Sequence, residues 1–416
     1  MPGYPSDFYN AISAKKGLIN RIAYIRQGLA GELESYRNPI ESPVKPPLQA
    51  ATDGGLGVKR LAGFTVYMIR GYSVAYRDNN GENSLVGEEI YADIGILIPP
   101  SREETRISLY RDAAELWTGY RLLRKLGSGG VYLGDGSVVS LIVEPSIVRM
   151  GRREKDNHPI KCILRKIDPE ELKEETIKNP LAARRLLGID EESAAKRQDM
   201  MNRGEEDLGN CALYLEYIEK TLLLRMLLEE AWKKNITPIF ISKSSRTSFL
   251  YGNKLYSDTY LIQLKDPQEP GNFYNPSRVR GGGGVEGHLW SLLERGIISS
   301  LDLFKGNILG LAEFYENLSV VRFYTRLQRD APILRVEVPL PASEFQYMDP
   351  GELKESIGTI VSSVSRELAG LELADGYPLI LKLVHERSKI SGREAEILFN
   401  ALGLQAEHGS REVLGE

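Results

Sequence analysis

Hydrophobic and polar positions follow two different periods along this chain. Runs rich in β-branched and aromatic residues that end at Gly, Pro or Asn-Gly predict strands, and apolar positions three or four residues apart predict helices. The predicted strands cover residues 47–53, 61–76, 89–98, 131–135, 236–242, 320–328 and 333–340. The predicted helices cover residues 7–36, 102–126, 213–234, 350–368, 378–388 and 392–402. This mixture predicts an α/β fold, and the short turns between the early strands predict antiparallel pairing.

Two of the predicted strands end in an aspartate that glycine follows. Asp53 precedes Gly54-Gly55, which predicts a turn that closes the first strand, and Asp135 precedes Gly136. A carboxylate at the end of a buried strand, with glycine behind it, lets a hard cation and a phosphate backbone approach closely. Each Asp-Gly pair taken alone also suits a plain turn.

A third acidic residue, Glu115, lies between these two on a predicted helix. Its position beside the apolar stripe faces neither the core centre nor open water, and a solvated carboxylate explains it equally well. Asp112, one turn away, is the alternative ligand. Because phosphodiester hydrolysis needs a metal to activate water and to neutralise charge, we interpret Asp53, Glu115 and Asp135 as ligands of a divalent metal used in nucleic-acid cleavage.

Composition changes along the chain and predicts four segments. Residues 1–46 form an N-terminal helix and a proline-rich linker, and residues 47–400 form the main domain. Charge density rises and aromatic residues are absent at about 145–207, which predicts a charged helical insertion that projects from the core. Residues 401–416 form a C-terminal tail.

The composition is that of an ordinary globular protein. The 416 residues carry a formal net charge of -4, with 42% hydrophobic and 26% charged residues, so a duplex-coating basic protein is not expected. A local basic channel inside an acidic whole remains compatible with nucleic acid. Cys162 and Cys211 are too few for a disulfide framework or a four-cysteine zinc site. Since neither a signal peptide nor a membrane span is expected, we predict a cytoplasmic protein without membrane contact.

Basic and glycine-rich segments offer candidates for phosphate binding. Lys243 follows the strand at 236–242, and Arg246 comes three residues later, a combination that suits phosphate neutralisation. A solvated helix cap explains the pair equally well. The run from Gly281 to Gly284 lacks the Lys and following Ser/Thr of a Walker-type loop, so it favours a flexible loop.

His385 lies on the apolar helix at 378–388, and Tyr377 precedes Pro378 at the start of that helix. A lone histidine on such a helix is often a hydrogen-bonded core residue. Beside three carboxylates it could instead bind manganese as a neutral imidazole, or steady a leaving oxygen as an imidazolium.

These segments together resemble the NurA nuclease family of archaea and some bacteria. The resemblance covers roughly residues 45–142 and 210–400. Its motifs, in chain order, are Thr52-Asp53-Gly54-Gly55, Glu115, Leu133-Gly134-Asp135-Gly136-Ser137, Ile241-Ser242-Lys243-Ser244, Ser257-Asp258, and Gly376-Tyr377-Pro378-Leu379 with His385. The last motif is the most specific, because Tyr and His stand eight residues apart around a Gly-Tyr-Pro helix start.

The resemblance implies a fold similar to ribonuclease H, with a mixed sheet flanked by helices. It implies that Asp53, Glu115, Asp135 and His385 bind manganese, with magnesium as the other candidate ion, and that Tyr377 supports the site. It further implies a homodimer that works with the hexameric translocase HerA in DNA end resection for recombinational repair. The implied activity is a 5′-to-3′ exonuclease on single- and double-stranded DNA and an endonuclease on single strands.

One departure from the family and two rival functions remain open. The usual small hydroxyl after Asp-Gly is Gly55 here, which predicts a looser turn behind Asp53. An actin-like or sugar-kinase-like ATPase would also use an Asp-Gly turn, for magnesium-nucleotide, but it needs a second glycine-rich phosphate turn. A non-catalytic clamp on the translocase would bind DNA without cutting it.

Overall fold

The computed structural model describes residues 35–61, 64–142, 168–189, 205–243, 247–252, 255–275, 289–291, 308–345 and 347–401. The predicted helix at 7–36 and the predicted tail at 401–416 therefore lie almost entirely outside the described residues. Among the helices within these ranges, none has both the length and the hydrophobicity to span a bilayer.

A ten-stranded mixed sheet runs through the described part of the chain. Its strands are β1 (Arg37–Asn38), β2 (Leu48–Arg60), β3 (Thr65–Asn79), β4 (Glu82–Ile96), β5 (Gly130–Asp135), β6 (Ile236–Ser242), β7 (Gly271–Phe273), β8 (Leu289–Ser291), β9 (Leu318–Arg326) and β10 (Leu334–Pro341). The order is β1-β7-β9-β10-β6-β5-β2-β3-β4, and β8 pairs with β9. A separate two-stranded sheet joins β11 (Leu373–Ala374) to β12 (Tyr377–Pro378).

The centre of the large sheet is parallel and its two flanks are antiparallel. β2 pairs parallel with β5, and β5 pairs parallel with β6. The hairpin neighbours β3 and β4 run antiparallel on one side, as the short turns predicted, and β10 and β9 run antiparallel on the other. The expected α/β class with a mixed sheet flanked by helices is confirmed, and the ribonuclease H-like label stays a prediction.

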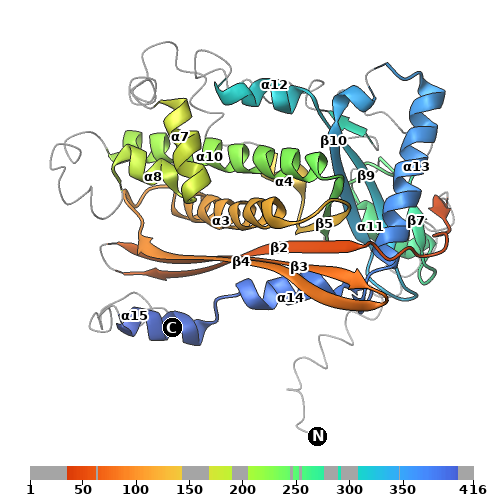
Figure 1. Ribbon diagram of the computed structural model, residues 1–416, viewed down its shortest axis with the longest axis horizontal. Coiled ribbons are helices and arrows are strands. Elements are labelled where there is room, and N and C mark those ends of the chain that lie inside the picture. The colour runs from red at the N-terminus through yellow and green to blue at the C-terminus, as the bar shows by residue number, and fades with distance from the viewer. Residues whose placement is uncertain are drawn as a thin grey trace, which may run out of the picture.

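Helices cover both faces of the sheet (Figure 1). The helices are α3 (Glu103–Lys125), α4 (Val138–Ile142), α7 (Pro169–Lys178), α8 (Ala182–Leu187), α10 (Glu205–Lys233), α11 (Asp258–Lys265), α12 (Leu311–Glu316), α13 (Pro350–Ala369), α14 (Leu379–Ser388) and α15 (Gly392–Ala401), with short 3-10 turns at Ile308–Gly310 and Ala342–Glu344. The apolar residues of α3 and α10 form one core with the sheet, and those of α13 and α14 form a second core on the opposite face.

The first strand is longer than its sequence pattern predicted. The expected turn at Gly54-Gly55 is wrong, because β2 continues to Arg60 and stays paired with β3 along its whole length. Both glycines are needed for close packing rather than for a turn. A Cβ at Gly54 would lie 2.9 Å from Arg111 Cγ, and one at Gly55 would lie 1.9 Å from the Ser388 carbonyl oxygen.

The charged stretch at 145–207 does not project from the core where it is described. Leu172 of α7 and Leu187 of α8 are buried in the same core as α3 and α10. A buried carboxylate anchors the start of α8, since Glu219 accepts hydrogen bonds from the backbone N–H groups of Ala182 and Ala183. The expectation of a projecting insertion is therefore wrong for residues 168–189, and α10 begins at Glu205 rather than near 213.

Candidate metal centre

Three adjacent parallel strands place functional side chains at one edge of the parallel region. β5 ends at Asp135 and β6 ends at Ser242, and the pairing of β2 with β5 stops at Thr52. Asp53 directly follows the last residue of β2 that pairs with β5, and Lys243 directly follows β6. The site is therefore at the carboxyl ends of parallel strands, the edge where ligands bind in open α/β sheets.

The alternation of side chains sends both aspartates to the same face. Ala51 of β2 and Leu133 of β5 belong to the core beneath α14. Because side chains two residues apart share one face of a strand, Asp53 and Asp135 point toward α14 as well. Helix α14 packs across β2 on this face (Figure 1). Its residue His385 contacts Asp53.

The His385 imidazole is bonded to Asp53 rather than buried in the core. His385 Nδ1 lies 2.9 Å from Asp53 Oδ2, and the imidazole side chain is 51% exposed. A carboxylate only accepts, so Nδ1 carries the hydrogen and Nε2 remains available. Ser388, one turn further along α14, also donates its hydroxyl hydrogen to Asp53 Oδ2, at 2.8 Å.

Two carboxylates and one imidazole converge closely enough to share an ion. One ligand atom from each of Asp53, Asp135 and His385 lies within 4.8 Å of the others. Oxygen and imidazole donors suit divalent ions such as manganese, zinc or iron, and the two hard carboxylates extend this to magnesium. Three of the four predicted metal ligands are thus brought together from β2, β5 and α14.

Glu115 approaches this group from the opposite face of the sheet. Thr52 Oγ1 donates to the Glu115 carbonyl oxygen at 3.2 Å, and a Cβ at Gly54 would lie 3.2 Å from Glu115 Cβ. Thr52 and Gly54 face α3, so Glu115 approaches β2 from the α3 side, whereas the Asp53 side chain lies on the α14 side. Glu115 is not part of the group that lies within 4.8 Å.

The charges of Asp53 and Asp135 nevertheless act on the Glu115 carboxyl. Burial raises the pKa of the Glu115 carboxyl well above its usual value, and the nearby Asp53, Asp112 and Asp135 raise it further. Asp112, the alternative ligand, is held at 2.7 Å by Arg111. A buried carboxyl surrounded by like charges is destabilised unless a proton or a cation neutralises it.

Lys243 and Tyr377 border Asp135. Lys243 Nζ lies 3.7 Å from Asp135 Oδ2 and 4.0 Å from the centre of the Tyr377 ring. Burial raises the pKa of the Asp135 carboxyl, and Lys243 partly offsets this increase. Lys243 is half-exposed, so its ammonium also reaches solvent.

The Tyr377 hydroxyl is the clearest sign that the site fits a further group. Tyr377 is buried, and its hydroxyl makes no hydrogen bond of normal length, although Asp135 is close enough to interact with it. Burial raises the pKa of this phenol, and Asp135 adds to the increase. A buried hydroxyl without a well-formed hydrogen bond, next to the carboxylate of Asp135, fits a site that binds a cation and its oxygen ligands.

The expected loosening at Gly55 is wrong. The chain does not turn there, and a side chain at this position would collide with the Ser388 carbonyl oxygen. Ser388 itself was missed by the sequence analysis. Its only signal was the spacing of three residues from His385, which places both on neighbouring turns of one helix.

Two other predicted features lie outside the described residues. These are Arg246 and the glycine run from Gly281 to Gly284. Cys211 is described and is a buried free thiol, whereas Cys162 is not described.

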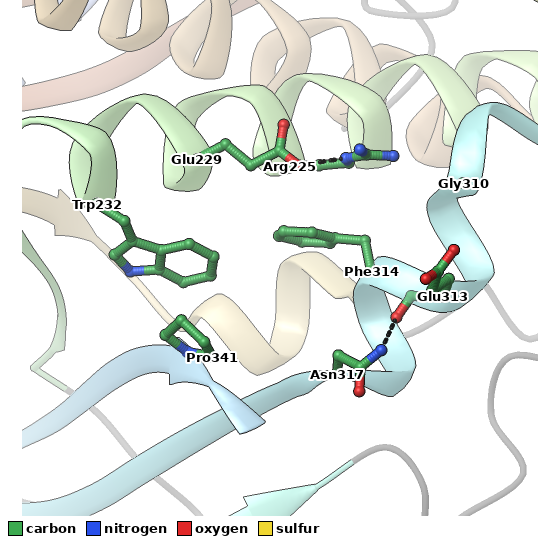
Figure 2. Close-up of a pocket in the computed structure, with 8 residues that line it drawn as sticks. All are labelled: Arg225, Glu229, Trp232, Gly310, Glu313, Phe314, Asn317 and Pro341. Carbon is green, nitrogen blue, oxygen red and sulfur yellow. Dashed lines mark hydrogen bonds and ion pairs between the residues drawn. The ribbon is translucent and has the colours of Figure 1, made fainter. Parts of the chain in front are cut away.

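A separate pocket of about 410 Å³ lies between α10, α12 and the end of β10 (Figure 2). Trp232 and Phe314 form its aromatic wall, with ring centres 5.9 Å apart. Arg225 lies over Phe314 and pairs with Glu229 at 2.8 Å. Because Arg225 is already paired with Glu229 and lies over Phe314, its charge is compensated within the pocket. The pocket is therefore a weaker candidate for a functional site than the group of Asp53, Asp135 and His385.

Fold and site together define a mixed α/β protein with a carboxylate and imidazole centre at the ends of its parallel strands. The NurA domain family matches residues 47–390, which is most of the chain. The chain therefore belongs to the NurA family, as the motifs predicted.

Solved structures of NurA proteins share the fold. The NurA nuclease from Sulfolobus solfataricus is 21% identical, with a TM-score of 0.57 and 96% of each chain covered. A structure of NurA bound to dAMP and manganese is 16% identical, with a TM-score of 0.59 and 97% of each chain covered. A third, NurA with manganese, is 16% identical, with a TM-score of 0.54 over 94% of this chain and 98% of the other. A search of curated proteins gave no match.

Proposed function

We propose that this protein is a manganese-dependent DNA nuclease, with magnesium as the alternative ion. The observation that carries the proposal is the convergence of Asp53, Asp135 and His385 within 4.8 Å. Family membership supports it, as do the solved NurA structures that contain manganese.

Asp53, Asp135 and His385 would hold the ion, and Glu115 would complete the site from the α3 side. A bound divalent ion supplies Lewis acidity, which activates water near neutral pH and neutralises charge on phosphate oxygens. His385 Nδ1 is tied to Asp53, so Nε2 is the nitrogen available to the ion or to the leaving oxygen. The bond from Asp53 fixes the orientation of the imidazole in either role.

Lys243 would neutralise a phosphate beside Asp135. Its ammonium is half-exposed and already lies at the edge of the site. Tyr377 would support the site beside Asp135, because its buried hydroxyl can donate to an oxygen that binds there. Arg246 is proposed as a second phosphate contact from its position in the sequence alone.

The finer activity follows from family membership. We propose 5′-to-3′ exonuclease activity on single- and double-stranded DNA and endonuclease activity on single strands. We further propose a cytoplasmic homodimer that acts with HerA in DNA end resection for recombinational repair. The nuclease domain would span residues 47–400, between the segments 1–46 and 401–416, with the charged stretch at 145–207 as an elaboration of it. Nothing among the described residues favours the ATPase or the clamp.

The direct test uses end-labelled linear DNA with purified protein, in manganese or in chelator. We expect shortened products with manganese, no products with chelator, and no products from Asp53→Ala in either condition. Wild-type protein that gives no product in manganese would refute the enzymatic activity. ATP turnover without DNA cleavage would favour the ATPase, and chelator-insensitive DNA binding without products would favour the clamp.

A further inference from the structure

Ser388 is a buried serine whose hydroxyl meets a proposed metal ligand. The side chain is 1% exposed, and its Oγ lies 2.8 Å from Asp53 Oδ2. The alternative acceptor is the His385 carbonyl oxygen, 3.1 Å away. Because a hydrogen bond to a charged carboxylate is shorter and stronger than one to a neutral carbonyl, the hydroxyl hydrogen is shared mainly with Asp53.

Ser388 and His385 together occupy one oxygen of Asp53. Oδ2 has two lone-pair positions, and it receives the His385 Nδ1–H and the Ser388 hydroxyl. Within the described ranges, no hydrogen bond or ion pair of the protein reaches Oδ1 of Asp53. The two oxygens of the carboxylate therefore have different roles in the fold.

The main chain holds Ser388 rigidly in this place. The Ser388 carbonyl oxygen approaches β2 so closely that a Cβ at Gly55 would lie only 1.9 Å from it. Ser388 is also the last residue of α14, whose apolar residues Ile380, Leu381 and Val384 are buried against the sheet. A hydroxyl fixed by such packing can hold a carboxylate rotamer at little further cost in conformational entropy.

We propose that Ser388 is a positioning residue for Asp53, which holds Oδ2 so that Oδ1 stays available to the divalent ion. The inference rests on the proposed function, because it takes Asp53 as a metal ligand. It predicts that loss of the Ser388 hydroxyl weakens metal binding without removing any ligand. Groups that orient a metal ligand in this way typically change affinity by about 10- to 100-fold.

The test measures manganese binding to the full-length protein without DNA, by the electron paramagnetic resonance signal of free Mn²⁺. Ser388→Ala is compared with wild type, Asp53→Ala and Ser365→Ala. Ser365 is the control, since it is a fully buried serine of α13 whose hydroxyl donates to the Val361 carbonyl oxygen and accepts from Asn272 Nδ2, so its loss disturbs buried hydrogen bonds without touching Asp53. Thermal melting of each variant in the presence of chelator measures the effect of the substitution on stability without metal.

We expect Ser388→Ala to bind Mn²⁺ about 10-fold more weakly, with a melting temperature close to that of Ser365→Ala. Ser388→Cys, similar in size and a weak donor, should lie between Ser388→Ala and wild type, and it carries the test if Ser388→Ala does not fold. Wild-type affinity in the Ser388 variants, together with loss of binding in Asp53→Ala, would overturn this inference and leave the proposed function intact. Wild-type affinity in Asp53→Ala would instead overturn the proposed function.

Discussion

Helix α3 contributes to two buried charged clusters that differ in how their charges are satisfied. Near its N-terminus, Arg106 is fully buried and pairs with Glu216 of α10 at 2.7 Å, while Tyr110 donates to the same carboxylate at 2.7 Å. Two backbone carbonyl oxygens, of Ile98 and Pro99, accept further guanidinium hydrogens. Further along, Glu115 lies among Asp53, Asp112 and Asp135, with Arg111 as the partly compensating cation.

The comparison separates a structural cluster from a binding cluster. In the first, the two opposite charges are paired and carry several buried hydrogen bonds, so no further ion is needed. In the second, burial and then like charges raise the pKa of Glu115, and the Tyr377 hydroxyl makes no hydrogen bond of normal length. Buried negative charge that the protein leaves uncompensated marks a functional site, because an ion can supply what the fold does not.

The largest expected effect is on cleavage, at the binding cluster. His385→Ala removes a proposed ligand and the imidazole bonded to Asp53, so cleavage should fall more than about 100-fold. DNA binding should change little, because the imidazole is one contact at the edge of a larger surface. Cleavage rates and DNA affinity on the same labelled substrate measure both. Equal loss of cleavage and binding would contradict the assignment.

The next effect is on stability, at the structural cluster. Glu216→Ala leaves the Arg106 charge buried without its partner and should lower the free energy of unfolding by about 3–5 kcal/mol. The control is Glu229→Ala on the same helix, which breaks the exposed pair with Arg225 and should cost less than about 1 kcal/mol. Urea denaturation in chelator measures both. Similar values for the two variants would show that the buried cluster is not the structural element described.

A smaller effect should appear in the pH dependence of stability. Burial, and then Asp53, raises the pKa of Glu115 well above its usual value of 4.5. At pH values between the pKa of the unfolded chain and the raised pKa of the folded protein, folded Glu115 holds a proton that unfolded Glu115 has lost. Stability should therefore fall as pH rises through this window. Glu115→Gln should reduce the fall and melt higher than wild type at pH 8 in chelator. Melting curves from pH 5 to pH 8 that are parallel for both proteins would refute this.

The smallest effect concerns phosphate contact. Lys243→Met should weaken DNA binding for every sequence and reduce the slope of log affinity against log salt concentration by about one. Lys382→Met is the control, since Lys382 lies on α14 and is paired with Asp375 at 2.7 Å. Fluorescence anisotropy over a salt series gives both slopes. An unchanged slope for Lys243→Met would remove its phosphate role.

Much of this arrangement could be predicted from local sequence. Asp53, Asp135 and His385 each lie beside a clear hydrophobic pattern, and the predicted β6, β9, β10, α13, α14 and α15 agree with the structure within a few residues. The turn predicted at Gly54-Gly55 was wrong, because a glycine that leaves room for a neighbouring backbone cannot be distinguished by sequence from a glycine in a turn. That close approach involves Ser388, more than 300 residues away in the chain.

The position of Glu115 could not be predicted for a different reason. Its helix and its place beside the apolar stripe were correct, but the face of β2 that it approaches depends on tertiary packing. The same holds for Ser388, whose role depends on the contact that α14 makes with Asp53 of β2. The charged stretch was predicted to project from the core because its few buried apolar residues, such as Leu172 and Leu187, stand among many charged ones. Its composition therefore did not indicate a face that packs on the core.

Crystals of the wild-type protein grown with manganese would test the central claim most directly. Anomalous differences collected at the manganese absorption edge locate the ion without reference to activity. We predict a strong peak bounded by the side chains of Asp53, Asp135 and His385. A manganese peak bound elsewhere, with none at these three side chains, would contradict the proposed metal site.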